Sequence, residues 1–396
     1  MNLPPHEARA DHPVTRSSDH PIPSGLYVHL PYCRSRCGYC AFVVSTDESS
    51  AGAYREALAR EIALLAEEAR GARFDSVYLG GGTPSLTPAP DLAALLEDIR
   101  RRFDVLASSE ITLEANPEDV TPGAARDWVS VGITRVSVGV QSFEDRELAA
   151  VGRRHDSARA RGALETLVRT GLALSADLIL GLPEQSTESF RSSLARLCES
   201  GVGHVSVYLL EAEKSKTIQE DRQVHPSRYL SDDAQADAWL EMGETLARAG
   251  FSHYEISNWA LPGRESRHNV KYWKRVPTLG LGVSAHEFWN ARRRANVSSL
   301  PRYIEEMTAG RRPLALDAPV AEDEAAREEI VLGLRLSEGV AAEDIEDRVR
   351  TSRDATLSED YASWKEDRLL LEDVPGRIRF SERGFLVSNE VLCRFV

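Results

Sequence analysis

Short apolar runs alternate with amphipathic stretches from residue 25 to about residue 256, and this alternation constrains the fold more than any other feature. Six of the apolar runs predict strands, over residues 26–30, 76–79, 111–115, 136–140, 172–180 and 205–210. Helices are expected between and after them, over residues 54–70, 92–103, 124–131, 188–200 and 234–249. Repeated strand–helix units predict an α/β fold with ligands at the carboxyl ends of parallel strands. The pattern alone leaves a closed barrel, an incomplete barrel and an open sheet as alternatives.

The composition argues against several classes of partner. Among the 396 residues, Asp and Glu number 62 and Lys and Arg 48, which gives a formal net charge of -14 and predicts no binding of nucleic acid. No apolar run approaches the roughly 18 residues of a membrane span. Residues 1–24 are rich in Pro, His, Ser and Asp and are interpreted as a disordered tail rather than a targeting peptide. The three arginines at 292–294 are expected to form a solvated turn.

Three of the five cysteines, Cys33, Cys37 and Cys40, are crowded into one short segment with the spacing C-x3-C-x2-C. The crowding and the odd total argue against a disulfide framework and favour a reducing compartment, the cytoplasm. Three thiolates so close together can hold three irons of a 4Fe–4S cluster and leave the fourth iron open to a small molecule. A structural zinc ion is the alternative, and it needs a fourth ligand, for which His29 is the candidate.

Glycine and polar residues follow several of the predicted strands. The run Gly80-Gly-Gly-Thr83 ends the second strand, where residues without a Cβ let the backbone approach a ligand. Glu114 and Gln141 end the third and fourth strands, and Asp177 is assigned to the end of the fifth. Such a series of polar strand ends predicts a ligand site at the mouth of the sheet or barrel. For Glu114, a surface position that caps the next helix remains the structural alternative.

These motifs resemble the radical S-adenosylmethionine (SAM) family that contains the oxygen-independent coproporphyrinogen III oxidases (HemN) and the haem chaperones (HemW). The resemblance covers residues 25 to about 300 most clearly. It implies an incomplete (β/α)6 radical-SAM barrel with a 4Fe–4S cluster on the three cysteines and SAM on the open iron. The residues that it assigns to SAM are Tyr27, Tyr39, Gly81, Gly82, Thr83, Glu114, Gln141, Arg153 and Asp177.

The resemblance also implies a reaction. Arg153 would clamp the SAM carboxylate through two parallel hydrogen bonds, and its neighbour Arg154 is the competing choice. An electron donor such as flavodoxin or ferredoxin would reduce the cluster. SAM would then be cleaved to methionine and a 5′-deoxyadenosyl radical, which removes a hydrogen atom from the substrate. In this scheme the protein supplies orientation and a dry cavity, and the cofactors supply the chemistry.

The character of the chain changes after about residue 300. Residues 322–333 predict a charged helix, residues 364–371 a second, amphipathic helix, and residues 376–380 a short hairpin. Two helices and a small hairpin suggest a winged-helix-like α+β module, as in this family, and the acidic context favours packing or a lid over binding of DNA. The predicted domains are therefore a tail at 1–24, the barrel with an extension at 25–300, and the C-terminal module at 301–396.

Two features favour the chaperone side of the family. Phe42 stands where the HemN oxidases carry a further cysteine. Residues 266–273 resemble an H-N-x-x-Y-W segment of HemW, with His268 as a possible axial haem ligand; His253 and His286 are competing ligands. The haem contacts that this segment implies are His268, Asn269, Tyr272 and Trp273. The alternative is that the His-Asn pair makes turn hydrogen bonds and the two aromatics belong to the core.

Three functions remain open at this point. The favoured one is a cytoplasmic chaperone that binds haem and delivers it to apo-proteins. The second is an oxygen-independent coproporphyrinogen III oxidase that forms protoporphyrinogen IX, which the missing cysteine argues against; whether the chain is an enzyme thus stays undecided. The third is a radical SAM enzyme that acts on an unrelated substrate.

Overall fold

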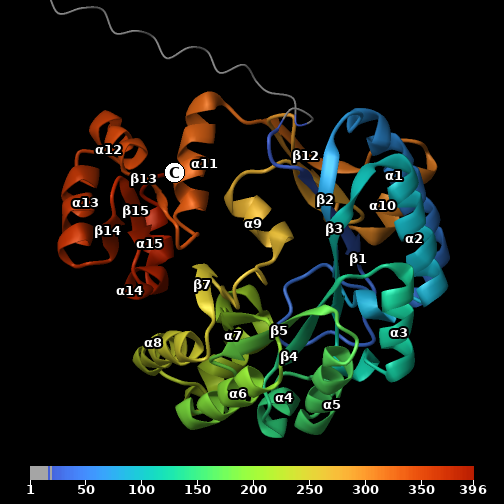
Figure 1. Cartoon of the computed structure of the whole chain (residues 1–396), viewed down its shortest axis with the longest axis horizontal. Coiled ribbons are helices and arrows are strands. Elements are labelled where there is room, and N and C mark those ends of the chain that lie inside the picture. The colour runs from blue at the N-terminus through green and yellow to red at the C-terminus, as the bar shows by residue number, and fades with distance from the viewer. Residues whose placement is uncertain (1–16, 18–19) are drawn as a thin grey trace, which may run out of the picture.

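The computed structural model describes residue 17 and residues 20–396, whose arrangement is shown in Figure 1. Most of the tail predicted at 1–24 lies outside the described residues, whereas Ser24 already begins the first strand. Within the described part of the chain, no helix is both long enough and apolar enough to cross a bilayer.

Six parallel strands form the centre of the structure. They are β1 (Ser24–Leu30), β2 (Arg73–Gly81), β3 (Asp104–Ala115), β4 (Arg135–Gln141), β5 (Ala173–Leu180) and β6 (His204–Leu209). Each strand pairs in parallel with the next one along the chain. The six strands predicted from the apolar runs are confirmed, with bounds that differ at their ends.

Helices join these strands and cover the outer face of the sheet (Figure 1). They are α1 (Ala51–Glu68), α2 (Ala89–Arg102), α3 (Pro122–Val131), α4 (Asp145–Ala150), α5 (Ser157–Val168) and α6 (Thr187–Glu199). The sequence of α1 explains this packing, because Leu58, Ile62 and Leu65 recur on one face and are buried in the main core. At α3, the Thr121 side chain caps the first turn and Gly132, with a φ of 93°, ends the helix.

Six shorter strands extend the sheet at both edges. They are β7 (Ser252–Glu255), β8 (Asn258–Ala260), β9 (Thr278–Leu281), β10 (His286–Trp289), β11 (Arg292–Asn296) and β12 (Leu314–Pro319). β8 and β7 follow β6, while β9 to β12 continue from β1, so the twelve strands of this sheet run from β12 to β7. The order leaves β12 at one edge of the sheet and β7 at the other. A sheet with two edges agrees with an incomplete (β/α)6 barrel.

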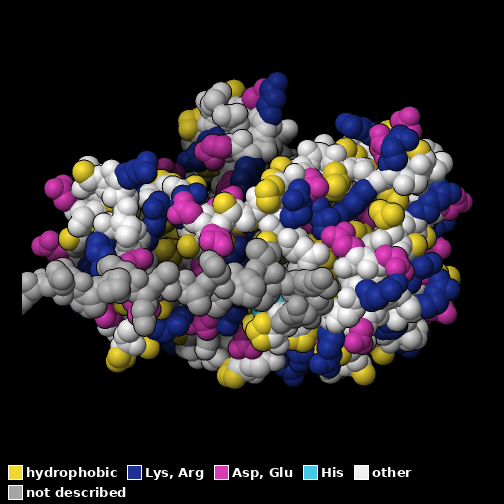
Figure 2. Space-filling view, turned by 90° about the horizontal axis from the view of Figure 1, so that it is seen from above, with side chains coloured by type: hydrophobic (Ala, Val, Ile, Leu, Met, Phe, Trp, Pro, Cys, Tyr) yellow, Lys and Arg dark blue, Asp and Glu magenta, His cyan; other side chains and the backbone are white. Residues whose placement is uncertain are grey.

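The arginines expected in a solvated turn at 292–294 lie instead in β11, so that expectation is wrong. Each arginine meets a carboxylate from a neighbouring element. The pairs are Arg292 with Asp317 at 2.7 Å, Arg293 with Glu328 at 2.8 Å, and Arg294 with Glu68 at 2.6 Å. Acidic and basic side chains are likewise interspersed on the face shown in Figure 2.

Four helices follow the sixth parallel strand before the C-terminal part of the chain. They are α7 (Lys216–Val224), α8 (Asp232–Arg248), α9 (Arg267–Trp273) and α10 (Leu300–Thr308). The helix predicted at 234–249 is thus confirmed as α8. Tyr303 and Met307 of α10 are buried in the main core, and β12 pairs with β11. Packing therefore places α10 and β12 with the barrel, although the predicted boundary assigned them to the C-terminal module.

The C-terminal module has its own three-stranded sheet and its own core. Its helices are α11 (Glu322–Gly333), α12 (Ala342–Thr351), α13 (Leu357–Glu366), α14 (Glu382–Leu386) and α15 (Ser388–Leu392). Its strands, in sheet order, are β13 (Val340–Ala341), β15 (Arg377–Phe380) and β14 (Leu370–Val374). In Figure 1 the module stands beside the barrel, with α14 nearest to α8 and β7.

The helix predicted at 322–333 is confirmed as α11. The second helix, predicted at 364–371, is misplaced: α13 ends at Glu366, Arg368 adopts a positive φ of 58°, and Leu370 begins β14. The hairpin predicted at 376–380 is present but longer. Residues 377–380 form only its second strand, and β14 is the first.

Candidate functional site

A cavity of about 570 Å³ opens at the carboxyl ends of the parallel strands. Its inner wall comes from the cysteine loop and from the ends of β2, β3, β4 and β5. Its outer wall includes Phe385 and Leu386 of α14 and Ser388 and Asn389 of α15. The barrel and the C-terminal module therefore enclose one shared cavity.

The three cysteines of the C-x3-C-x2-C segment all line this cavity, and all are free thiols. Backbone hydrogen bonds hold their loop in place, from Cys33 N to Ser45 O at 2.9 Å and from Gly38 N to Val151 O at 3.0 Å. The Thr83 hydroxyl donates to Cys33 Sγ at 3.2 Å. Burial raises the pKa of the Cys33 and Cys40 thiols, and binding of iron would displace these protons.

His29 is not positioned as a fourth ligand for zinc. Its Nε2 lies 2.9 Å from the Val43 carbonyl oxygen and its Nδ1 3.1 Å from the Tyr27 hydroxyl, so both ring nitrogens are occupied. Among the described residues, no group of three or more His, Cys, Asp or Glu could hold a single metal ion. A cluster differs from one ion because its thiolates bind separate irons.

The glycine run after β2 packs against the cysteine loop. A Cβ on Gly81 would lie 2.6 Å from the ring of His29, and a Cβ on Gly82 would lie 2.6 Å from the backbone carbonyl of Pro31. Gly82 N also donates to Leu30 O at 2.8 Å. Gly81, Gly82 and Thr83 do line the cavity, but the close approach that requires glycine is to the chain's own cysteine loop.

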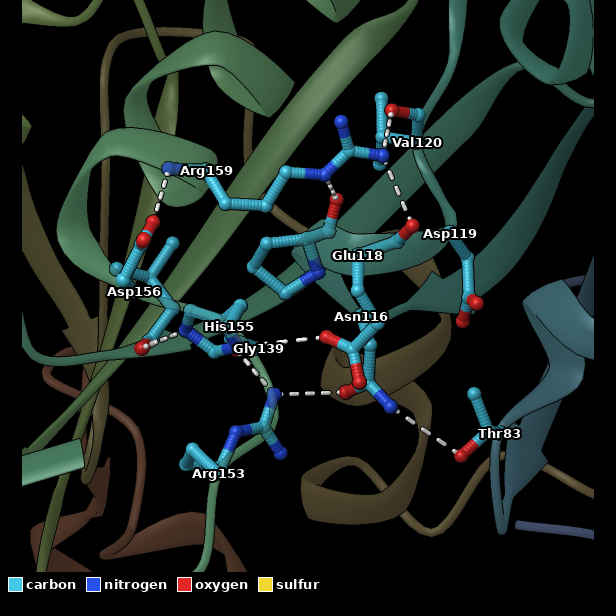
Figure 3. Close-up of polar contacts among 12 residues, drawn as sticks. Thr83, Asn116, Glu118, Asp119, Val120, Gly139, Arg153, His155, Asp156 and Arg159 are labelled. Atoms are coloured by element: carbon cyan, nitrogen blue, oxygen red, sulfur yellow. Dashed lines mark hydrogen bonds and ion pairs between the residues drawn. The ribbon is translucent and has the colours of Figure 1, made fainter. Parts of the chain in front are cut away.

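Arg153 faces the cavity, whereas Arg154 is exposed and is not part of the cavity wall. One Arg153 nitrogen, Nη2, donates to Asn116 Oδ1 at 2.7 Å and to Gly139 O at 2.6 Å, as Figure 3 shows. The other, Nη1, lies 3.6 Å from Cys37 Sγ and 3.4 Å from the Tyr39 hydroxyl. These contacts join the cysteine loop to the ends of β3 and β4.

Two carboxylates face the cavity from β3 and β5, the strands on either side of β4. Glu114 accepts hydrogen bonds from the Tyr78 hydroxyl at 2.8 Å and from Gly81 N at 3.0 Å, and burial raises its pKa to about 7. Asp177 accepts one from Ser137 Oγ at 3.4 Å, and burial raises its pKa to about 6. Contrary to the sequence-based assignment, Asp177 lies inside β5 rather than at its end.

Two buried polar atoms at this wall have no hydrogen-bond partner among the described residues: Arg153 Nε and Gln141 Oε1. Gln141 also has a positive φ of 67°, a conformation that a non-glycine residue adopts rarely. A guanidinium nitrogen, an amide oxygen and two partly desolvated carboxylates together suit a ligand that carries both positive and negative groups.

Several residues of this wall escaped sequence reasoning. Asn116 bridges the site, because its Nδ2 donates to Thr83 Oγ1 at 3.3 Å while its Oδ1 accepts from Arg153. Tyr208 on β6 lines the cavity and is 45% exposed. The position of Asn116 directly after a strand was a usable signal, since it follows Glu114 in the same strand-end motif.

Tyr27 and the predicted haem contacts His268, Asn269, Tyr272 and Trp273 do not line this cavity. His268 is buried, with Nδ1 3.0 Å from Ser76 Oγ and Nε2 2.9 Å from the Tyr272 hydroxyl. Burial also lowers the pKa of His268 to about 3. Both ring nitrogens of His268 therefore already have partners, and the axial-ligand role of His268 stays a prediction.

The competing histidines are no better placed at the cavity. His253 stacks on Trp259 at 4.1 Å and bonds to Glu382 Oε1 at 3.0 Å. His286 is exposed on β10, and neither histidine is part of the cavity wall.

Comparisons with known proteins agree with this geometry. Residues 27–197 match the model of the Radical SAM superfamily, and residues 320–387 match that of the HemN C-terminal domain. The solved structure of coproporphyrinogen III oxidase (HemN) from Escherichia coli has a TM-score of 0.81 at 24% identity and covers 96% of this chain and 91% of its own, which shows the shared fold. Fold and cavity together define a radical SAM protein, and this class binds a 4Fe–4S cluster and SAM.

Several curated proteins that are similar to this chain are named heme chaperone HemW. The one from Lactococcus lactis is 30% identical over 376 residues, which covers 94% of this chain and 97% of the relative. The one from Mycobacterium tuberculosis is 33% identical over 375 residues, which covers 93% of this chain and 94% of the relative. The one from Escherichia coli is 34% identical over 267 residues, and covers 67% and 70%. The chain belongs to the HemW family.

Proposed function

We propose that this protein is a haem chaperone, which binds haem and passes it to apo-proteins in the cytoplasm while it carries a 4Fe–4S cluster and SAM. The observation that carries the proposal is the similarity to relatives named heme chaperone over nearly the full length of both chains. The cavity supports it, since one space combines free thiols, the carboxylates of Glu114 and Asp177, and apolar side chains from the C-terminal module. All five cysteines are free thiols, in keeping with a reducing compartment.

The cluster would be held by Cys33, Cys37 and Cys40. They fit it because the three thiols line one cavity and each comes from the same anchored loop. The Arg153 guanidinium beside Cys37 Sγ places a positive charge where thiolates would form. When bound, the cluster and SAM supply one-electron chemistry.

SAM would be held by the unpartnered and charged groups of the inner wall. Arg153 would bind its carboxylate, and Glu114 and Asp177 would face its positive groups. The unpartnered Arg153 Nε and Gln141 Oε1 support this assignment, because a ligand would satisfy both. Tyr39, Gly81, Gly82 and Thr83 line the same wall.

Haem would contact the outer, apolar part of the cavity rather than His268. Phe42 is 64% exposed at the cavity wall, and Leu210, Ile256 and Leu386 line the cavity as well. An apolar macrocycle buries its faces against such side chains. Arg36 of the cysteine loop also lines the cavity and would supply a positive charge for a propionate group.

Haem titration and a coproporphyrinogen assay on one sample test the proposal. The protein would be reconstituted anaerobically with iron and sulfide, supplied with SAM and a reducing donor such as flavodoxin or ferredoxin, and titrated with haem. We expect saturable haem binding and no protoporphyrinogen IX from coproporphyrinogen III. Formation of protoporphyrinogen IX would establish the oxidase alternative, and cleavage of SAM with indifference to both tetrapyrroles would indicate another substrate.

A further inference from the structure

Helix α9 packs against β1 and β2 near their amino ends, at the opposite end of these strands from the cavity. Its approach to β1 is so close that a Cβ on Gly25 would lie 3.0 Å from the Lys271 side chain and 3.1 Å from the His268 ring. Lys271 Nζ forms an ion pair with Asp75 at 2.6 Å and donates to Pro23 O, also at 2.6 Å. The segment that contains the H-N-x-x-Y-W sequence is therefore built into the barrel floor.

From this floor, a column of aromatic rings leads to the cavity wall. The His268 ring stacks on Tyr78, with centroids 5.1 Å apart and planes 28° apart. Tyr27 stacks on Tyr78 at 6.2 Å and 24°. Tyr78 thus contacts two rings, and its hydroxyl donates to Glu114 Oε1 at 2.8 Å.

We propose that Tyr78, and through it His268, are positioning residues that orient the Glu114 carboxylate toward SAM, so that the H-N-x-x-Y-W segment serves the SAM site. This inference rests on the proposed SAM site. Three observations support it: both ring nitrogens of His268 have hydrogen-bond partners, its ring contacts Tyr78, and the Tyr78 hydroxyl donates to Glu114 of the cavity wall.

The pH dependence of SAM binding distinguishes positioning from a merely structural role. The Tyr78 hydrogen bond favours the ionised Glu114 and so lowers its pKa, against the stronger effect of burial. The other titratable groups that face Glu114 come from four elements: Tyr27 on β1, Asp177 on β5, Tyr208 on β6 and Tyr272 on α9. Because a cationic ligand needs the ionised carboxylate, SAM affinity should fall as pH drops through the pKa of Glu114, and loss of the Tyr78 hydroxyl should move that fall to higher pH.

The first test is Tyr78→Phe, which keeps the stacked ring and removes the hydroxyl. SAM affinity would be measured by calorimetry on the anaerobically reconstituted protein across the neutral pH range. We expect affinity about tenfold weaker near neutral pH, with its pH midpoint shifted upward. Tyr32→Phe is the matched control, because the Tyr32 hydroxyl bonds to Ser50 Oγ at 3.0 Å and not to the site; it should match the unmodified protein.

The second test is a double-mutant cycle with His268→Ala. His268→Ala should weaken SAM binding alone but cause no further loss in the Tyr78→Phe background, because His268 acts through Tyr78. If Tyr78→Phe does not fold, as judged by circular dichroism, Glu114→Gln replaces it in the same cycle, since removal of the acceptor should also abolish the effect of His268→Ala.

The outcomes separate the inference from the proposed site. Unmodified protein that fails to bind SAM would overturn the SAM site itself. The positioning role alone would be overturned if the unmodified protein binds SAM and Tyr78→Phe has the same affinity and pH midpoint. It would also be overturned if the losses of affinity from Tyr78→Phe and His268→Ala add up fully in the double variant.

Discussion

At the residue scale, Arg153 and Arg154 carry the same charge one position apart, yet only Arg153 faces the cavity. Its planar guanidinium reaches Asn116 and Gly139 through Nη2 and Cys37 Sγ through Nη1, and the single ammonium of lysine cannot span all three. We therefore predict that Arg153→Lys weakens SAM binding by about tenfold or more. Arg154→Lys is the matched control and should leave the affinity unchanged in the same calorimetric titration. Equal losses in the two variants would contradict the assignment.

The cysteine assignment predicts a difference in bound iron. Cys37→Ala removes one of three cavity thiols, so the reconstituted protein should lose most of its iron and its cluster absorbance. Cys198→Ala is the matched control, because Cys198 lies in α6 and is not part of the cavity wall. Iron and sulfide per chain are the quantities to measure. Full cluster occupancy in Cys37→Ala would exclude Cys37 as a ligand.

The raised pKa of Glu114 predicts that the stability of the ligand-free protein depends on pH. The pKa of Glu114 in the folded protein is about 7, above the ordinary value of 4.5. Between these two pH values the folded protein binds more protons than the unfolded protein, so the free energy of unfolding falls as pH rises. Glu114→Gln should therefore raise the stability above about pH 7 by roughly 1–2 kcal/mol, and the gain should vanish below about pH 4.5. Thermal melts across this range provide the measurement. A gain that stays constant at every pH would show that the charge of Glu114 is not responsible.

At the scale of elements, the loop after β2 and the cysteine loop depend on their close contact. Gly82→Ala would place a Cβ 2.6 Å from the Pro31 carbonyl. This carbonyl belongs to the backbone, so it can move away only if the cysteine loop shifts. We predict a loss of about 1–3 kcal/mol in the free energy of unfolding, measured by denaturant titration. Gly52→Ala in α1 is the matched control, since its Cβ would meet nothing within 4 Å, and it should be neutral or slightly stabilising. A neutral Gly82→Ala would contradict the packing described here.

The sequence predicts long, periodic elements well and short ones poorly. The six parallel strands and α11 were predictable because their apolar residues repeat over several positions. β7 to β12 are only three to six residues long, and their pairing depends on strands far away in the chain. The error at 364–371 has the same origin, because an apolar pattern of that length fits either the end of a helix or the start of β14.

Residues near the cavity were predictable where a motif follows a strand, as for Glu114 and Gln141. His268 shows the limit of this reasoning. Its motif is recognisable in the sequence, but its burial follows from α9 packing into the barrel floor beside Ser76 and Tyr78, which are almost 200 positions away in the chain. Such long-range contacts decide whether a histidine is free to bind a ligand.

At the scale of the whole molecule, the barrel and the C-terminal module line one cavity together. α14 packs against α8, and α14 and α15 supply the outer wall of the cavity. The wall of this cavity combines the carboxylates of Glu114 and Asp177 with apolar side chains such as Leu386 and Phe42, which is 64% exposed.

Transfer of haem to an acceptor tests the central claim most directly. The protein, reconstituted anaerobically and loaded with stoichiometric haem, would be mixed with an apo-protein that gains a distinct absorption spectrum when it binds haem. If the protein is a haem chaperone, the acceptor spectrum should appear faster than with the same concentration of free haem, and coproporphyrinogen III should remain unchanged. Transfer no faster than from free haem, together with conversion of coproporphyrinogen III to protoporphyrinogen IX, would contradict the account.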